Sequence, residues 1–538
     1  MFMREELTRT IKILYPFYLL CLLFTPLLLA ALINKVLFDS REILIDLAWL
    51  TLFTTISYIS KKQVIYQIAC CLFFLNGTIQ LIHWILLHGP LTLTSLLVLS
   101  NTNLQEAYEF FELKASLRLF ILIPYCWLFI MAMKHKFQKS SSRSSAITAA
   151  ILLSGVIVFM SYDAFKQRFI RKASPPIVRV IAAYINDADL YKEAGTKQFP
   201  KKINAFSSNQ LSRQTVVLII GESVNKNHLS LYGYQRKTSP LLSKRKDIIA
   251  YNNVVSAYSN TLNAVLSMFS NAAIDTSIPS QQQVDLIDVF YSAGFKTYWI
   301  SNQSPIGIWD NKVSMLAQKS DNCIFVNTTA NNSFESINTA SYDSKLLAPF
   351  AKALQAEAPK KFIVVHLMGS HASYAKRYPA AFAQFNGKDE RSSLIAHYDI
   401  SILYTDFIVD SLLTLISQHS TNPKEFCTAI YLADHGENVY DENNDVGHGF
   451  AGKLPHANVE IPFLLWLSPH FLTDSVVTRA HLNNVREIPF VSDDLFHAVI
   501  DIAQIKTSYL NKTRSLFNPA FASNRRRILE DGIEYDLR

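Results

Sequence analysis

The sequence predicts a two-part protein, in which an N-terminal module of five transmembrane helices precedes a soluble α/β sandwich. The chain has 538 residues, which is too long for one ordinary domain. Half of its residues are hydrophobic and only 17% are charged, and the long uncharged runs all lie before about residue 162. From about residue 215, short β-rich runs alternate with amphipathic segments. We therefore divide the chain into a membrane module (1–162), an interfacial linker (163–214) and a soluble domain (215–538).

Five apolar segments predict the membrane-spanning helices, because a helix needs roughly 20 apolar residues to cross a bilayer. Residues 13–34 and 63–88 contain no charged side chain. The other three segments cover residues 43–60, 119–133 and 145–162. The first segment is long for a signal peptide and no small-residue cleavage site follows it, so we interpret it as a retained anchor.

The distribution of Lys and Arg predicts how the module is oriented. The N-terminal segment and the loops at 61–62 and 134–143 are richer in Lys and Arg than the alternate loops. The positive-inside rule then places the N-terminus in the cytoplasm. Five spans put the soluble domain on the other side, which in a bacterial inner membrane is the periplasm. The formal charge of +8 is modest, and no basic helix with interleaved aromatic residues is present, so we expect no nucleic-acid partner.

The soluble domain reads as an α/β sandwich whose sheet is covered on both faces. Continuous apolar runs separated by longer amphipathic segments are typical of such buried sheets. Strands are predicted at residues 215–220, 295–301, 361–368, 428–434 and 461–468. Helices are predicted at residues 261–270, 283–293, 394–417 and 493–504.

Carboxylate and imidazole side chains follow three of these strands. They are Glu222 after the first strand, His366 and His371 at and after the third, and Asp434, His435 and His448 after the fourth. Each residue alone is compatible with a turn, a cap or a loop. Ligands collect beyond the carboxyl ends of strands in such sheets, and two carboxylates with imidazoles suit a borderline cation such as zinc. The group as a whole therefore predicts a metal site.

A candidate nucleophile lies at the start of a predicted helix. Ser259 or Asn260 suits the N-cap position, which puts Thr261 at the helix N-terminus. Backbone N–H groups and the helix dipole favour an ionised hydroxyl or a phosphate at that place. Metal coordination would lower the pKa of the hydroxyl further. By chemistry alone, Ser256, Ser259 and Ser267 are rival nucleophiles.

These motifs together resemble the bacterial phosphoethanolamine transferases, inner-membrane enzymes that modify lipopolysaccharide and related glycans. The resemblance rests on "IIGES", "LYGYQRKTSP", "NTLNAV", "HLMGSHASYAKRYP", "YLADHGEN", "GHG" and "DDLFHAVID", in this order along the chain. It implies a soluble domain of the alkaline-phosphatase or sulfatase type. It also implies one zinc ion, held by Glu222, the nucleophile Thr261, Asp434 and His435, and leaves room for a second.

The resemblance also implies a reaction in two steps. Thr261 takes phosphoethanolamine from phosphatidylethanolamine, and a lipopolysaccharide or other glycolipid acceptor then receives it. The histidines of "HLMGSH" and "GHG" bind a second zinc or the donor headgroup, or transfer protons. We assign His371 and His448 to catalysis, and His366 and Asn302 to substrate binding.

The cysteine content departs from part of this family. Members that act on lipid A usually carry several disulfides in the soluble domain, whereas only Cys323 and Cys427 lie there in this chain. Whether these two pair does not follow from their spacing. We therefore favour a core sugar over lipid A as the acceptor. The alternatives are a phosphoglycerol transferase of the same layout and a non-catalytic membrane sensor with a phosphatase-like domain.

Overall fold

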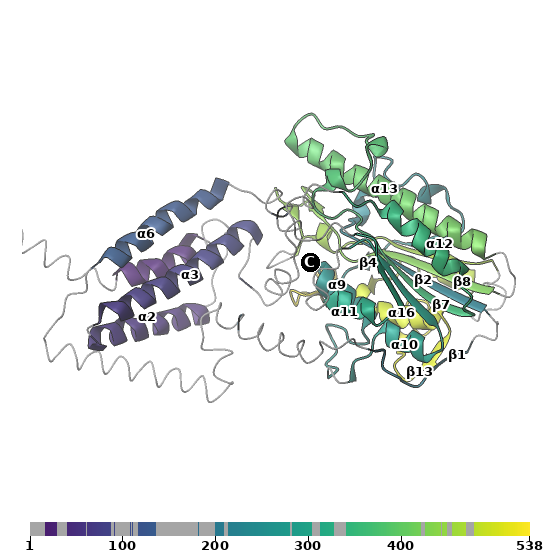
Figure 1. The fold of residues 1–538 in the computed structure, drawn as a ribbon, viewed down its shortest axis with the longest axis horizontal. Coiled ribbons are helices and arrows are strands. Elements are labelled where there is room, and N and C mark those ends of the chain that lie inside the picture. The colour runs from purple at the N-terminus through teal and green to yellow at the C-terminus, as the bar shows by residue number, and fades with distance from the viewer. Residues whose placement is uncertain are drawn as a thin grey trace, which may run out of the picture. The chain divides into compact units, whose positions relative to one another are not determined.

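The structure, a computed structural model, falls into two compact units (Figure 1). One unit comprises residues 1–99 and 114–193, and the other comprises residues 100–113 and 194–538. The structure describes residues 17–29, 40–60, 62–87, 91, 108, 110, 117–135, 181, 199–208, 213–279, 282–303, 312–327, 340–420, 425–442, 444–448, 454–469 and 478–537.

The first unit consists of apolar helices that pack around aromatic side chains. Its described helices are Phe17–Leu29, α2 (Ser40–Ser60), α3 (Gln63–Leu87), the 3-10 turn η1 (Leu117–Ile121) and α6 (Leu122–Lys134). The Tyr125 hydroxyl is buried and donates to the carbonyl of Leu22 at 2.7 Å, and Phe74 stacks on the Tyr125 ring. A polar group inside a bilayer needs such an internal partner, so this bond fixes α6 against the first helix.

The outward faces of these helices suit a lipid surround. Large apolar side chains are exposed along α3 and α6, namely Val64, Ile68, Leu72, Leu75, Ile123, Trp127 and Ile130. Two helices of this unit, Gln63–Leu86 and Leu117–Lys134, are long and apolar enough to cross a membrane, and Phe17–Leu29 and Asp46–Ile56 are shorter apolar helices. The predicted span at 145–162 lies outside the described residues. The number of five spans therefore stays a prediction.

The second unit is built on a mixed seven-stranded sheet with the strand order β3-β11-β8-β2-β7-β5-β6 (Figure 1). The neighbouring pairs from β8 to β6 are parallel, and β11 runs antiparallel to both β8 and β3. The strands are β2 (Arg213–Gly221), β3 (Ile248–Tyr251), β5 (Lys296–Ser301), β6 (Asn322–Phe325), β7 (Lys360–His366), β8 (Glu425–Ala433) and β11 (Phe463–Leu467). All five predicted strands are confirmed, and β3 and β6 are additional.

Short strand pairs and helices complete this unit. The short strands are β1 (Ala205–Ser207), β4 (Val254–Val255), β9 (Asn438–Val439), β10 (Val446–Gly447), β12 (Phe490–Val491) and β13 (Ile505–Thr507), paired as β1-β13, β9-β10 and β12-β4. The helices are α9 (Thr261–Phe269), α10 (Leu286–Ser292), α11 (Lys312–Gln318), α12 (Leu347–Gln355), α13 (Glu390–His419), α15 (Arg479–Asn484) and α16 (Leu495–Ile502). The four predicted helices are confirmed as α9, α10, α13 and α16.

Alternation along the strands gives the sheet two buried faces. In β2, Val216, Leu218 and Ile220 pack with α9, α10, α11 and α16, whereas Val217 and Ile219 pack with α12 and α13. Figure 1 shows these helices as layers on opposite sides of the sheet. The helix α13 has the length and the apolar composition of a membrane span, but here its apolar side covers the sheet. The predicted sandwich with both faces covered is confirmed.

Two further features bear on the sequence predictions. Cys323 in β6 and Cys427 in β8, both among the described residues, are free thiols and do not pair. His228 forms a buried clamp: its Nδ1 lies 2.6 Å from Asp399 of α13, and its Nε2 lies 2.8 Å from Asp441. We call these three residues the histidine clamp. It fastens the segment that follows β2 to α13 and to the loop after β9.

Candidate active site

Parallel pairing brings two strand ends together at one edge of the sheet. The register matches Gly221 of β2 with Ala433 of β8, and the N–H of Asp434 continues the ladder by donating to the carbonyl of Gly221 at 3.0 Å. The residues that follow the two strands are therefore neighbours. One oxygen or nitrogen from each of Glu222, Asp434 and His435 lies within 4.8 Å of the others, and all three residues are fully buried.

The hydroxyl of Thr261 completes this group. It lies 3.1 Å from Oε2 of Glu222 and 3.3 Å from Nε2 of His435. Thr261 is the first residue of α9, and the side chain of Asn260 caps the helix by accepting from the N–H of Asn263 at 3.1 Å. The hydroxyl thus lies at a helix N-terminus, where anionic oxygens are stabilised. The structure brings together the four residues that the family resemblance assigned to zinc.

The rival hydroxyls have other environments. The Oγ of Ser256 donates to the carbonyl of Asp434 at 2.5 Å, and the Oγ of Ser259 donates to the carboxylate of Glu530. Ser267 is in the second half of α9, and its Oγ is buried without a hydrogen-bond partner. Of the four hydroxyls, only that of Thr261 contacts both a carboxylate and an imidazole of the site.

The electrostatics of the three buried ligand candidates suit a cation. Burial raises the pKa of Asp434, and the charge of Glu222 raises it further, to about 7. Burial opposes ionisation of Glu222 and His435 too. The hydrogen bond and charge of His435 nevertheless lower the pKa of Glu222. The charge of Asp434, together with the hydrogen bond and charge of Glu222, raises the pKa of His435 to about 10. The Oδ2 atom of Asp434 is buried without a hydrogen-bond donor. Two carboxylates, an imidazole and a hydroxyl form a donor set that zinc accepts, so the residues fit a zinc ion.

Several contacts fix the orientation of Glu222. Its Oε1 accepts from the hydroxyl of Ser223 at 2.7 Å, and its Oε2 accepts from the amide of Gln303 at 3.2 Å. Ser223 has a φ of 57°, an uncommon value for a residue with a side chain. On the other side, a Cβ at Gly369 would lie 2.8 Å from the carbonyl oxygen of Glu222. The loop after β7 therefore approaches Glu222 as closely as only a glycine permits.

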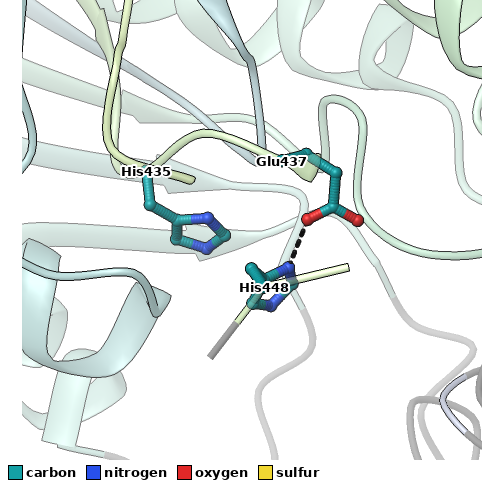
Figure 2. A group of neighbouring side chains, drawn as sticks. All are labelled: His435, Glu437 and His448. Atoms are coloured by element: carbon teal, nitrogen blue, oxygen red, sulfur yellow. Dashed lines mark hydrogen bonds and ion pairs between the residues drawn. The ribbon is translucent and has the colours of Figure 1, made fainter. Parts of the chain in front are cut away.

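A second group of polar side chains adjoins the first through His435. Figure 2 shows His435, Glu437 and His448 with His448 turned toward Glu437. The Nδ1 of His448 lies 2.6 Å from Oε2 of Glu437, and the rings of His435 and His448 are 4.2 Å apart between centroids. The hydroxyl of Tyr374 donates to the other oxygen of Glu437. The carboxylate thus fixes the orientation of His448 and leaves its Nε2 for another partner.

The remaining predicted residues lie in different environments. His366 is buried at the end of β7 with neither ring nitrogen hydrogen-bonded, and burial lowers its pKa to about 4. The ring of His371 is 6.4 Å from that of His448 between centroids. Asn302 is fully buried, and its amide bonds with Ser341 and with Asp343. Its amide is therefore engaged by the protein itself.

Sequence reasoning missed the residues that support the site. Asp343 accepts from the N–H groups of Met368 and Gly369 at 2.8 and 2.9 Å, and so holds the loop after β7. Asn302 joins this network through Asp343. Gln303 and Glu437 were also given no role from the sequence. Usable signals existed for two of these residues. Gln303 lies two positions after the end of β5, and Glu437 lies two positions after His435 and is the same kind of group as the predicted ligands.

Curated relatives of this chain are named as phosphoethanolamine transferases. The chain is 31% identical over 327 residues to phosphoethanolamine transferase EptC of Escherichia coli O18:K1:H7, covering 58% of this chain and 55% of the relative. It is 32% identical over 325 residues to phosphoethanolamine transferase CptA of Salmonella typhimurium, covering 58% and 55%. The chain thus spans about half the length of these relatives.

Solved structures share the fold. The zinc complex of the C-terminal periplasmic domain of Escherichia coli EptC matches with a TM-score of 0.56 and 27% identity, covering 63% of this chain and 97% of that domain. The integral membrane protein lipooligosaccharide phosphoethanolamine transferase A of Neisseria meningitidis matches with a TM-score of 0.68 and 19% identity, covering 94% and 97%. The family model described as Sulfatase matches residues 214–505, which is more than half of the chain. This protein therefore belongs to the sulfatase family.

Proposed function

We propose that this protein transfers phosphoethanolamine from phosphatidylethanolamine to a lipopolysaccharide acceptor, through a covalent intermediate on Thr261. The observation that carries the proposal is the position of the Thr261 hydroxyl, within 3.3 Å of both Glu222 and His435 and at the N-terminus of α9. The names of the curated relatives support the choice of transferred group.

In the first step, the oxygen of Thr261 attacks the phosphorus of the donor. A bond between this oxygen and phosphorus forms, the bond between phosphorus and the glycerol oxygen breaks, and diacylglycerol leaves with a proton. In the second step, an acceptor oxygen attacks the same phosphorus and forms a new bond to it. The bond between phosphorus and the Thr261 oxygen breaks, and the acceptor's proton replaces the phosphoryl group on Thr261. The N-terminus of α9 favours negative charge on the transferring phosphoryl oxygens in both steps.

The residues that would hold zinc are Glu222, Thr261, Asp434 and His435. Bound zinc would supply Lewis acidity, which lowers the pKa of the threonine hydroxyl and stabilises charge on the phosphoryl oxygens. The buried Oδ2 of Asp434 accepts no hydrogen bond and lies 3.5 Å from Nε2 of His435, and this supports the assignment. So does the similarity to a periplasmic domain that was solved with zinc. The zinc content of the purified protein tests whether a second ion binds.

We assign the proton transfers to the histidines beside this group. Glu437 accepts from Nδ1 of His448, which leaves Nε2 to give a proton to the leaving oxygen or to take one from the acceptor. The ring centroid of His371 lies 6.4 Å from that of His448, so we assign His371 to the same proton transfers. His366 has unbonded ring nitrogens that suit a substrate group. For Asn302 we propose a positioning role, because its amide is already bonded to Ser341 and Asp343.

The two-part architecture is consistent with lipid substrates. A donor and an acceptor that are both lipids require the reacting groups to be near a bilayer surface. The apolar helices of the first unit, Gln63–Leu86 and Leu117–Lys134, are long enough to anchor the chain there. We propose a multi-pass inner-membrane protein with a cytoplasmic N-terminus and a periplasmic catalytic domain. The free thiols of Cys323 and Cys427 fit the preference for a core sugar acceptor.

Mass spectrometry of lipopolysaccharide tests the proposal. Cells that lack the protein are complemented with wild type, with Thr261→Ala or with Ser267→Ala, and mild acid separates lipid A from the core before analysis. We expect a phosphoethanolamine increment on the core fraction with wild type and with Ser267→Ala, but none with Thr261→Ala. Ser267→Ala is the matched control, because it removes another hydroxyl from the same helix.

Each other outcome rejects part of the proposal. An increment on lipid A would reject the preferred acceptor and keep the reaction. An increment restored by Thr261→Ala would reject the nucleophile. A phosphoglycerol increment would reject the donor. Zinc is measured on the purified wild type in parallel: about one or two ions per chain are expected, and a metal-free protein would favour the non-catalytic alternative.

A further inference from the structure

The segment that leads into Thr261 is attached to the C-terminal part of the chain through one carboxylate. The Oε1 of Glu530 accepts from the N–H of Ser259 at 2.8 Å and from the Ser259 hydroxyl. Its Oε2 accepts from the amide nitrogen of Asn260 at 3.3 Å. The N–H of Glu530 also donates to the carbonyl of Ala257 at 3.0 Å. Glu530 therefore contacts three of the four residues that precede Thr261.

The contact with Asn260 determines which way its amide points. The Nδ2 of Asn260 donates to Glu530, so its Oδ1 is left to accept from the N–H of Asn263 and to cap α9. If the amide rotated by half a turn, its NH2 group would face the N–H of Asn263 and the cap would be lost. The acceptor at position 530 is what selects the capping orientation.

The part of the chain that carries Glu530 is itself firmly held. Residues 527–537 fold back on themselves, with a bridge between Ile528 and Glu534, and we call this segment the C-terminal hairpin. Leu529 is fully buried among Val255, Ala257 and neighbouring apolar residues. The guanidinium of Arg527 donates to the side chain of Asn253 at 2.7 Å. The hairpin is thus a fixed support on which Glu530 is presented.

We infer that Glu530 is a positioning residue for the nucleophile: it orients Asn260, which caps α9 and sets the direction of the Thr261 hydroxyl. This inference rests on the proposed role of Thr261. Glu530 itself makes no contact with Glu222, Asp434 or His435 among the hydrogen bonds and ion pairs of the described residues. Its main effect is therefore on the direction of the Thr261 hydroxyl, to which turnover is sensitive, while Glu222, Asp434 and His435 keep their contacts with one another. The charge of Glu530 also acts on His435 without a hydrogen bond between them.

A swap of amide and carboxylate tests this inference in the full-length protein. Glu530→Gln places an amide NH2 against the Nδ2 of Asn260, two donors facing each other, and Asn260→Asp places two carboxylates face to face. The double variant restores one donor and one acceptor, and the aspartate that it introduces is an equally good N-cap. Glu534→Gln, the same chemical change elsewhere in the hairpin, is the matched control.

Four quantities are measured on each variant in detergent: kcat and KM with phosphatidylethanolamine, zinc content, and amide hydrogen exchange at Asn263. For Glu530→Gln we expect kcat to fall by about tenfold while KM stays within about twofold. Zinc should be retained, because Glu222, Asp434 and His435 still converge on one point. Exchange at Asn263 should accelerate in the same variant. The double variant should recover both kcat and slow exchange, and Glu534→Gln should match wild type.

The outcomes separate this inference from the proposed function. Unchanged kcat and unchanged exchange in Glu530→Gln would overturn the inference. So would a double variant no better than the singles, because a merely structural role predicts additive losses. If wild type has no transferase activity but the exchange pattern follows the swap, the proposed function is rejected while the orienting role of Glu530 is supported.

Discussion

The histidine clamp makes a quantitative prediction about stability and pH. His228 is 4% exposed and lies between Asp399 and Asp441, and Tyr234 and Arg236 also bond to Asp399. Burial lowers the pKa of His228, but the hydrogen bonds and charges of the two aspartates outweigh it and raise the pKa from 6.5 to about 9. The imidazole of His228 therefore binds its proton more tightly in the folded protein than in the unfolded chain.

The sign and size of the effect follow from this pKa. A group whose pKa is higher in the folded state contributes stability fully below its unfolded pKa and loses it as the pH rises through the folded value. For His228, the contribution is present below pH 6.5 and is lost through about pH 9. The difference between the two pKa values corresponds to about 3 kcal/mol of unfolding free energy.

Urea unfolding of the detergent-solubilised chain, followed by circular dichroism, measures this contribution at pH 6 and pH 9.5. Many groups titrate between these values, so the informative quantity is the difference between wild type and His228→Gln. We expect His228→Gln to be less stable than wild type by about 3 kcal/mol at pH 6, and by much less at pH 9.5. Glutamine has a similar reach but carries no charge.

A matched control is His397→Gln, which replaces a histidine of α13 that bonds to Tyr378 and not to the clamp. Its difference from wild type should not follow the same pH dependence. A constant gap between wild type and His228→Gln at both pH values would refute the reasoning. That result would mean that His228 is held as a neutral ring in the folded protein.

Three further predictions concern the sheet and the metal site. Glu222→Gln should reduce zinc affinity, measured by competition with a chelator. The loss should exceed the roughly 10–100-fold that is typical when a residue hydrogen-bonded to a metal ligand is removed. Unchanged affinity would exclude Glu222 as a ligand. Gly369→Ala should weaken zinc binding as well, because the new Cβ would lie 2.8 Å from the carbonyl oxygen of Glu222. Its control is Gly294→Ala, at another glycine with positive φ where a Cβ would meet no atom within 4 Å, and equal zinc affinity in the two variants would contradict the prediction. Leu218→Ala, at a fully buried position of β2, should lower the unfolding free energy by about 2–5 kcal/mol in urea titrations, and a loss below about 1 kcal/mol would show that the core refills the space.

The sheet could be predicted from the sequence where its strands are buried on both sides. The five predicted strands include the central β8, β2 and β7, whose side chains are almost all buried, so their sequences are continuous apolar runs. The two strands that were missed, β3 and β6, are the two edges of the sheet. Each has only four residues. So short a run cannot be assigned to a strand by its pattern alone, although β3 is apolar and largely buried.

Helix α12 was missed for a different reason. Its sequence, LAPFAKALQ, contains Pro349 in the first turn, and proline reads as a breaker in a sequence although the first turn tolerates it. The correct placement depends on packing: Phe350 and Leu354 are buried against the sheet with α13. Phe350, Ala353 and Leu354 have the spacing of one helical face, so an amphipathic pattern was present and the proline outweighed it.

The residues of the candidate site also fall into two groups: those that follow a strand in the sequence, and those that are recognised only by their contacts in the fold. Glu222, Asp434 and His435 were predictable because each directly follows a strand, and parallel strands end at the same edge. Asp343 and Glu530 were not, because each acts through hydrogen bonds to residues far away in the chain. Their own surroundings in the sequence contain no motif. Asn302 was predicted as a substrate contact, yet its amide belongs to the Asp343 network.

The three buried residues proposed as metal ligands and the proposed nucleophile are therefore oriented by different parts of the fold, which meet where the Thr261 hydroxyl contacts Glu222 and His435. The ladder between β2 and β8 and the loop at Gly369 position Glu222, Asp434 and His435, whereas the cap of α9 and the C-terminal hairpin position Thr261. A change in one of these parts should therefore affect mainly the residues that it orients. Changes at Gly369 should reduce zinc content first, and changes at Glu530 should reduce turnover in a protein that still binds zinc. A variant of either support that lost both properties together would show that the two parts of the site are coupled.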